Sequence, residues 1–260
     1  MHPRLSFMLE IIQKLGEFQH RYFRTEIEFE QKSHIMNDVV SFVDRECEKM
    51  FHDALREKFP DDYVMGEETF DPKYDYSQHD NLWIIDPLDG TLMYQRGVPT
   101  YWPMIAYVEN GVVRYSAILL PELNELYYAD ETGAYRNGKK ITVSKTNTLK
   151  TSIIHSTDSS LRHSFDNDTK YCHFLDSRGK GLDTYSCAFS LSLCASWGID
   201  WWLVTARTHK PWDSVPGSFL IQQAGGKVTT LWSDSWDIFN SRVLYSNGFI
   251  HDEFQKILAS

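Results

Sequence analysis

Two kinds of apolar periodicity alternate along this chain, and they limit its possible fold more than any other feature. Residues 5–15 and 39–51 carry apolar side chains at helical spacing, which predicts two amphipathic helices near the start. Residues 102–120 instead form two strand-like runs joined at Asn110-Gly111, a dipeptide typical of β-hairpins. This mixture predicts a layered α/β fold rather than an all-α or an all-β one.

The second half of the chain continues the mixture. Residues 187–204 predict a helix of small residues and then a strand, and residues 218–231 predict a helix that stops at Gly225-Gly226. Residues 27–38 are polar and lack a period, so we expect a loop or hairpin there. Because no repeat or linker divides the sequence, we expect one domain over residues 1–260, with halves of about 1–150 and 151–260.

The charge of the chain argues against two classes of partner. It has 36 acidic and 26 basic residues, a formal net charge of -10, so its long-range field repels nucleic acid and anionic membranes. We expect neither as a partner. An acidic protein that handles an anionic substrate must neutralise charge locally, and a bound divalent cation is one way to do so.

Neither the cysteines nor the first residues indicate export. The four cysteines form no CxxC pair and are too sparse for a disulfide scaffold, so we expect reduced core thiols. Charged residues interrupt the first 18 positions, which argues against a signal peptide or a membrane span. The expected location is cytoplasmic.

The segment WIIDPLDGT, residues 83–91, is the first candidate site. An apolar strand ends at Asp86, Pro87 forces a turn, Asp89 follows within reach, and Gly90 to Leu92 open a helix. Two neighbouring carboxylates repel each other unless a proton or cation intervenes, and hard oxygen ligands suit Mg²⁺. The helix N-terminus is a ready phosphate site. An Asx-turn with an N-cap explains this segment equally well when it is taken alone.

Further acids follow other apolar segments. Glu67 and Glu68 come after the short run YVM, where a strand can deliver carboxylates to a sheet edge. Asp213 lies just ahead of an apolar helix, where a simple N-cap next to Trp212 is the alternative explanation. Each of these signals is weak by itself.

Together the segments resemble the signature of the inositol monophosphatase superfamily. Order and spacing agree with its pattern of an aspartate, GEE, DP(I/L)DGT and WD, here Asp44, Gly66-Glu67-Glu68, residues 86–91 and Trp212-Asp213. The resemblance implies an αβαβα sandwich of the inositol monophosphatase/fructose-bisphosphatase type. It also implies a lithium-sensitive, homodimeric hydrolase of phosphomonoesters.

The same resemblance implies a role for each motif residue. Two or three Mg²⁺ ions are expected. Glu67, Asp86 and the carbonyl of Leu88 would bind one ion, and Asp86, Asp89 and Asp213 a second. Such ion pairs stabilise both oxygens of an in-line displacement at phosphorus. Glu67 and the Thr91 hydroxyl would orient the attacking water, with Asp44 supporting Thr91, while Gly90, Thr91 and Leu92 would hold the phosphate. Glu68 is left as a supporting residue without a defined role.

Substrate choice is less clearly indicated. Inositol phosphatases place a glutamate shortly before the WD motif, but this chain has no acid between Asp200 and Asp213. It carries Arg207 and Lys210 there, which form either a solvated basic turn or a site for a second anionic group. Asp183 and Tyr185 resemble the corresponding stretch of histidinol-phosphate phosphatases. A histidinol-phosphate, sugar-bisphosphate or nucleotide phosphatase is therefore the alternative to an inositol-phosphate phosphatase.

Two non-enzymatic interpretations also fit parts of the sequence. One is a catalytically idle relative that binds small phosphorylated metabolites, and the other is a structural α/β protein whose acids are helix caps. Because the four carboxylates and Thr91 are all present, we expect a magnesium-dependent phosphomonoesterase.

Overall fold

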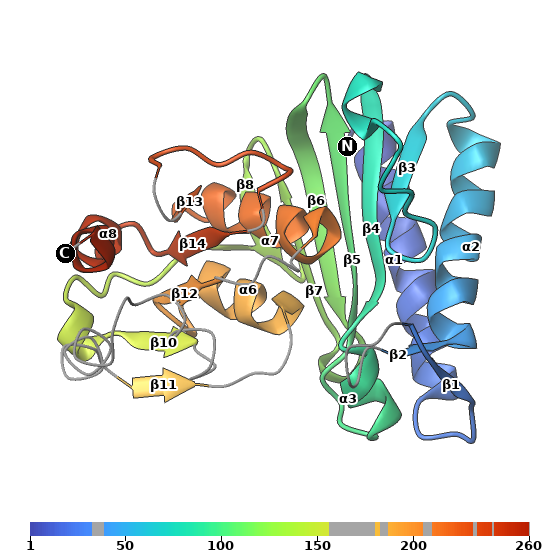
Figure 1. The fold of residues 1–260 in the computed structure, drawn as a ribbon, viewed down its shortest axis with the longest axis horizontal. Helices are drawn as coiled ribbons and strands as arrows, with labels where there is room; N and C mark the ends of the chain where they lie inside the picture. The colour runs from blue at the N-terminus through green and yellow to red at the C-terminus, as the bar shows by residue number, and fades with distance from the viewer. Residues whose placement is uncertain are drawn as a thin grey trace.

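The computed structural model describes residues 1–32, 39–155, 180–182, 187–204, 210–230, 233–240 and 242–259. Their helices and strands stack in five layers (Figure 1). Helices α1 (Pro3–Tyr22) and α2 (Phe42–Lys58) cover one face of a seven-stranded sheet, and α6 (Cys187–Ala195) and α7 (Pro211–Gln223) cover the other. A five-stranded sheet and α8 (His251–Ala259) follow. The layering confirms the expected αβαβα sandwich.

The seven-stranded sheet is antiparallel except for its first pair. Its strands lie in the order β3-β4-β5-β6-β7-β8-β9, and β3 is parallel to β4. The bounds are β3 Tyr63–Gly66, β4 Asn81–Asp89, β5 Trp102–Glu109, β6 Val112–Leu120, β7 Glu125–Asp130, β8 Gly133–Arg136 and β9 Lys139–Ile141. The predicted hairpin is present, because Asn110 and Gly111 both adopt positive φ and join β5 to β6.

The five-stranded sheet is mixed. Its order is β11-β10-β12-β14-β13; β10 is parallel to both of its neighbours, whereas β14 is antiparallel to β12 and β13. The bounds are β10 Ile153–His155, β11 Lys180–Leu182, β12 Trp201–Leu203, β13 Lys227–Thr230 and β14 Val243–Ser246. Among the described residues, the remaining elements are a short hairpin of β1 (Phe29–Gln31) and β2 (Val39–Ser41), helix α3 (Thr91–Gln95) and single turns of 3₁₀ helix at Tyr76–Gln78, Pro121–Leu123 and Leu149–Thr151.

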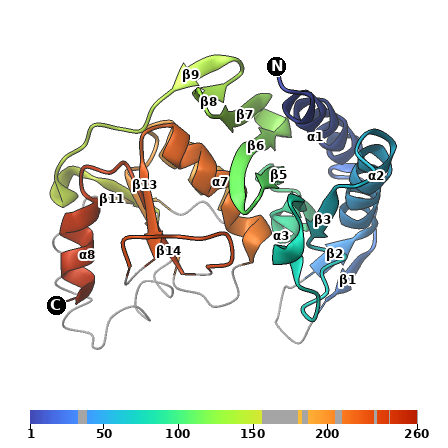
Figure 2. The same cartoon turned by 90° about the horizontal axis from the view of Figure 1, so that it is seen from above.

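The first two helices pack as their apolar periodicity predicts, with one difference at the start of α2. The two helices lie beside each other along the sheet (Figure 2). Phe7 and Phe51 contact each other, and both contact Trp83 of β4. Val39, which we predicted to be helical, belongs to β2 instead. Ser41 has an extended backbone and caps the helix, so α2 begins only at Phe42.

Strand β4 contains the irregularity that positions the site. Asp86 pairs with Met104 and Asp89 with Trp102, so three steps on β4 match two steps on β5. This is a β-bulge with one extra residue, and Pro87, which has no N–H for the sheet ladder, lies inside it. In the described ranges, no helix is long and apolar enough to cross a membrane.

Candidate active site

The bulge of β4 places Asp86 in the interior of the molecule. Its side chain is 2% exposed, and its Oδ1 accepts a hydrogen bond of 2.9 Å from the N–H of Leu88. The Asx-type turn that we considered as an alternative is therefore present. This turn does not compensate for the burial of the Asp86 carboxylate. Burial and the charges of Glu67, Asp89 and Asp213 still raise the pKa of Asp86 well above its usual value.

Asp89, Gly90 and Thr91 connect the bulge to two helices. Asp89 Oδ2 accepts a hydrogen bond of 2.8 Å from the N–H of Ala188 in α6. Gly90 has a φ of 88°, and a Cβ there would lie 2.5 Å from the carbonyl oxygen of Thr100, so only glycine fits. Helix α3 then begins at Thr91, with Gly90 as its N-cap and Leu92 in its first turn.

Thr91 is held by the residue that the family resemblance pairs with it. Its Oγ1 lies 2.9 Å from Asp44 Oδ1 and 3.0 Å from the carbonyl oxygen of Leu88. The second carboxylate oxygen of Asp44 accepts hydrogen bonds from the N–H and hydroxyl of Ser41, at 2.8 and 2.6 Å. Asp44 is fully buried, and this burial raises its pKa although the hydrogen bonds oppose the shift.

The loop after β3 brings Glu67 and Glu68 next to β4. The N–H of Glu67 donates to the carbonyl of Ile85. Lys32 Nζ, which follows β1, donates to both carboxylates, at 2.7 Å to Glu67 and 2.5 Å to Glu68. Burial and the charge of Glu67 raise the pKa of Glu68 to about 7. The lysine thus supplies one positive charge to a site that is otherwise acidic.

Glu48 of α2 holds the same loop from the inside. This carboxylate is 1% exposed and accepts hydrogen bonds from the N–H of Glu68, at 2.8 Å, and from the hydroxyl of Thr69. A Cβ at Gly66 would lie 2.4 Å from Glu48 Oε1, so the glycine of the GEE motif is required for this close approach.

Asp213 reaches the cluster from α7 in the second half of the chain. Lys210 is the N-cap of that helix and Asp213 is its third residue, so our alternative interpretation of Asp213 as the N-cap is wrong. Its Oδ2 accepts a hydrogen bond of 2.8 Å from the N–H of Lys210. Burial, Glu67 and Asp89 nevertheless raise the pKa of Asp213 well above its usual value.

The candidates for substrate recognition are only partly described. The ammonium of Lys210 lies over the ring of Phe70, 5.5 Å from its centroid, which places the residue beside the loop that carries Glu67. Asp183, Tyr185 and Arg207 lie outside the described residues.

Sequence reasoning did not single out Lys32 or Glu48. A signal for Glu48 exists in retrospect, because it lies one helical turn after Asp44 and therefore on the same face of α2. Lys32 lies in the polar segment before α2, and nothing in its spacing connects it with the GEE motif. Gln19, which was not singled out either, is a polar residue in an otherwise apolar helical stripe.

The donor set suits a hard cation, but it is not assembled as a finished cage. Within the described ranges, no three His, Cys, Asp or Glu side chains are arranged to hold a metal ion. The contacts above explain this: Lys32 pairs with Glu67, and backbone N–H groups bind Asp86, Asp89 and Asp213. Burial and the neighbouring acids still raise the pKa of Asp86 and of Asp213, so a divalent cation would relieve the repulsion and fits these residues chemically.

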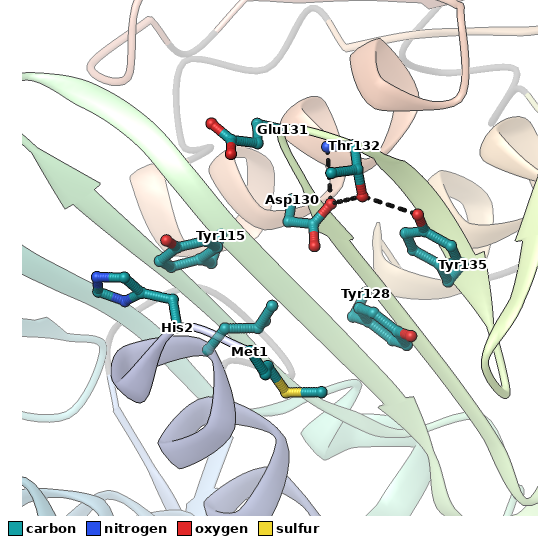
Figure 3. A pocket seen from close by; sticks show the side chains of 9 residues that line it. Met1, His2, Tyr115, Tyr128, Asp130, Glu131, Thr132 and Tyr135 are labelled. Atoms are coloured by element: carbon teal, nitrogen blue, oxygen red, sulfur yellow. Dashed lines mark hydrogen bonds between the residues drawn. The ribbon is translucent and has the colours of Figure 1, made fainter.

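A separate cavity lies on the opposite side of the same sheet. It has a volume of about 370 Å³ and is lined by His2, three tyrosines of β6 to β8 and the acidic turn after β7 (Figure 3). Tyr128 and Tyr135 stack there with ring centroids 5.0 Å apart. None of the motif carboxylates lines this cavity, so it is distinct from the candidate active site.

Comparison with known proteins agrees with this geometry. The model of the inositol monophosphatase family matches residues 1–260. The chain belongs to this family. Members of the inositol monophosphatase family hydrolyse phosphomonoesters, so the protein is a phosphatase.

Individual relatives resemble this chain in sequence, in fold or in both. It is similar to the fructose-1,6-bisphosphatase/inositol-1-monophosphatase of Thermotoga maritima, with 33% identity covering 98% of this chain and 95% of the relative. A solved Thermotoga maritima IMPase superposes with a TM-score of 0.85 at 30% identity, covering 99% of this chain and 97% of that one. An IMPase/NADP phosphatase solved with Mg²⁺ and phosphate shares the fold, with a TM-score of 0.86 at 22% identity, covering 97% and 93%.

Proposed function

We propose that this phosphatase is magnesium-dependent and acts on small phosphomonoesters at the carboxylate cluster. The observation that carries the proposal is electrostatic. Burial and the charges of Glu67 and Asp89 raise the pKa of both Asp86, in the bulge of β4, and Asp213, at the start of α7, while Lys32 pairs with Glu67 beside them. A protein keeps such repulsion where a cation is to be bound.

Five groups would hold the ions. Glu67, Asp86 and the Leu88 carbonyl form one set, and Asp86, Asp89 and Asp213 form the other. Bound Mg²⁺ would neutralise the phosphate and make water a better nucleophile. Lys32 contacts one carboxylate oxygen of Glu67, and if the metal took the place of the ammonium there, Lys32 would keep its contact to Glu68.

Thr91 and Asp44 would orient the attacking water. A hydroxyl has one proton, so Thr91 donates either to Asp44 or to the Leu88 carbonyl. When it donates to Asp44, its oxygen lone pairs are available to accept a hydrogen bond from water. Asp44 cannot turn away, because Ser41 holds its other oxygen. Gly90, Thr91 and Leu92 would bind the phosphate oxygens through their backbone N–H groups.

We further propose that the preferred substrate carries a second anionic group. The described residues before the WD motif, 201–204 and 210–212, contain no acid to accept hydrogen bonds from sugar hydroxyls. Lys210 instead places a cation on Phe70 beside the Glu67 loop. The name of the Thermotoga maritima relative, which combines a bisphosphatase with an inositol monophosphatase, supports testing both classes.

A substrate panel tests these proposals directly. Phosphate release from inositol phosphate, histidinol phosphate, fructose bisphosphate and phosphoadenosine phosphate is compared by kcat/KM, with Mg²⁺ or with a chelator. We expect release to require Mg²⁺, to fall at least a hundredfold in Asp213→Asn, and to show uncompetitive inhibition by Li⁺. Release that persists with the chelator, or in Asp213→Asn, would overturn the metal assignment.

Lys210→Ala tests the specificity proposal within the same panel. We expect it to raise the KM of a bisphosphate more than that of a monophosphate. Lys227→Ala, which removes an exposed lysine paired with Asp252, is the matched control and should change neither KM. Equal effects of Lys210→Ala on both substrates, or a kcat/KM for inositol phosphate far above all others, would contradict a second anionic group. Gel filtration and light scattering test the expected homodimer.

A further inference from the structure

Gln19 is an unexpected residue for the position that it occupies. It belongs to the stripe of α1 that includes Met8, Ile12 and Leu15, and like them it is fully buried. A buried amide is unfavourable unless its polar atoms are hydrogen-bonded. An apolar side chain would be the ordinary choice here, so the contacts of the amide show what it contributes.

The amide of Gln19 reaches the bulge that carries the candidate metal ligands. Its Nε2 donates a hydrogen bond of 2.5 Å to the carbonyl oxygen of Pro87, which lies between Asp86 and Asp89. Only the nitrogen of the amide can donate, so this contact fixes the orientation of the group. The amide oxygen then faces away, and it is buried without a hydrogen-bond partner among the described residues. Besides a contact with the thiol of Cys47, the bond to Pro87 is the polar contact that a leucine or methionine would not provide.

Both sides of one peptide unit are held as a result. Gln19 binds the C=O of the Pro87–Leu88 peptide, and Asp86 Oδ1 accepts its N–H. Because a peptide is planar, a restraint on the C=O is also a restraint on the N–H, and through it on the carboxylate of Asp86. The next carbonyl, that of Leu88, is the one that contacts Thr91.

We propose that Gln19 is a positioning residue for the metal site: from α1 it fixes the Pro87–Leu88 peptide so that the Asp86 carboxylate and the Leu88 carbonyl are oriented for Mg²⁺. The inference rests on the proposed function, since it assumes that these two groups are metal ligands. Gln19 itself touches neither substrate nor metal, and its effect is transmitted by the bulge.

A neighbouring hydrogen bond provides the control. The hydroxyl of Tyr94, a buried residue of α3, donates to the backbone carbonyl of Gln19 at 2.7 Å. Tyr94→Phe therefore removes one buried hydrogen bond from the same cluster without touching the bulge. Gln19→Met removes the bond to Pro87 and keeps the volume of the side chain.

Metal binding is measured without substrate, by electron paramagnetic resonance of Mn²⁺ and by calorimetric titration of Mg²⁺. We expect Gln19→Met to weaken both by about three- to tenfold, because a net hydrogen bond is worth about that ratio. Amide exchange of residues 82–92 in the metal-free protein should become faster. At saturating Mg²⁺ the KM should be unchanged. Tyr94→Phe should lower thermal stability comparably and alter metal affinity less than twofold.

Gln19→Asn guards against a folding failure of the methionine variant. Its amide is one carbon shorter and falls short of Pro87, so it should weaken metal binding as well. Wild-type metal affinity in a folded Gln19→Met or Gln19→Asn would overturn the proposal, as would an equal loss in Tyr94→Phe. If wild type binds Mn²⁺ at this site but releases no phosphate from any substrate, the proposed function fails while the positioning role of Gln19 stands.

Discussion

Two regions of the molecule, the candidate site and the network around Asp200 and His251, bury ionisable groups in opposite ways. In the C-terminal half, Asp200 accepts hydrogen bonds from the N–H of Ile153 and the hydroxyl of Ser144, and the ring nitrogens of His251 face the hydroxyls of Ser246 and Thr229. In the candidate site, Asp86 is buried as deeply as these residues but faces other acids. Burial alone therefore does not mark a functional residue; uncompensated like charge does.

Asp44 and Glu48 are intermediate between these two kinds of buried acid. Both lie on α2, both are fully or almost fully buried, and each accepts hydrogen bonds from a loop that carries candidate ligands. Their oxygens are satisfied as in the C-terminal half, yet the groups that they hold belong to the site. The hydrogen-bonded acids of α2 thus hold in place the loops that carry the cluster of repelling carboxylates.

The largest effect is expected from Asp86→Asn. Asparagine can still accept the hydrogen bond from Leu88, but a neutral amide binds Mg²⁺ poorly, so phosphate release should fall at least a thousandfold, or about 4 kcal/mol. Without metal, its free energy of unfolding in urea should equal or exceed that of wild type, because one repelling charge is gone. Retention of more than a tenth of wild-type kcat would show that Asp86 is not a ligand.

A smaller effect is expected at His251 when pH is lowered. Burial, followed by the charge of Lys227, lowers the pKa of His251 to about 4. The folded protein therefore resists a proton that the unfolded chain binds. The stability that depends on the neutral ring is complete above about pH 6.5 and is lost as pH falls toward 4, by about 3 kcal/mol.

Urea unfolding at a series of pH values, with wild type and His251→Gln compared, measures this change. Glutamine has no titrating group, so the variant should lose less stability between pH 6.5 and 4 than wild type. The carboxylate cluster should act in the opposite sense in metal-free protein, since the raised pKa values of Asp86 and Asp213 favour folding at low pH and lose that contribution as pH rises. Parallel profiles for wild type and His251→Gln would refute the role of the neutral ring.

The smallest effect is expected from Asp200→Asn, which tests the closed network. The amide replaces one accepting oxygen with a donor next to groups that themselves donate, so unfolding free energy should fall by about 1–3 kcal/mol. Activity per folded molecule should stay at the wild-type level, since Asp200 is not among the proposed ligands. If activity fell far more than stability, the division between structural and functional acids would be incorrect.

Local patterns were sufficient to predict part of the fold. Apolar patterns predicted α1, most of α2 and strand β4 as far as Asp86, although β4 continues through the bulge to Asp89, and Asn110-Gly111 predicted the β5–β6 turn. The position of β14 between β12 and β13 was beyond such reasoning, because strand order depends on contacts between segments far apart in the chain. Val39 shows the limit at a boundary, since its helical spacing was outweighed by pairing with β1.

For the site, the motifs indicated which acids matter but not how they are held. The spacing of residues 83–91 predicted that Asp86 and Asp89 lie near each other, and the charge of Asp89, which raises the pKa of Asp86, agrees with this. The contacts of Lys32, Glu48 and Gln19 with the site span 20 to 68 positions of sequence. No local period encodes such distances, so these residues became visible only in three dimensions.

The extra residue of the β4 bulge also explains why the two aspartates of the motif are three positions apart. On a regular strand, side chains alternate between the two faces, so an odd separation would send the carboxylates to opposite sides of the sheet. Their partners on β5, Met104 and Trp102, are two positions apart and share one face. Because of the bulge, the side chains of Asp86 and Asp89 point to the same face of the sheet although they are three positions apart. A regular strand with the same three-position separation would leave one carboxylate facing α1, on the side of the sheet away from α7 and Asp213.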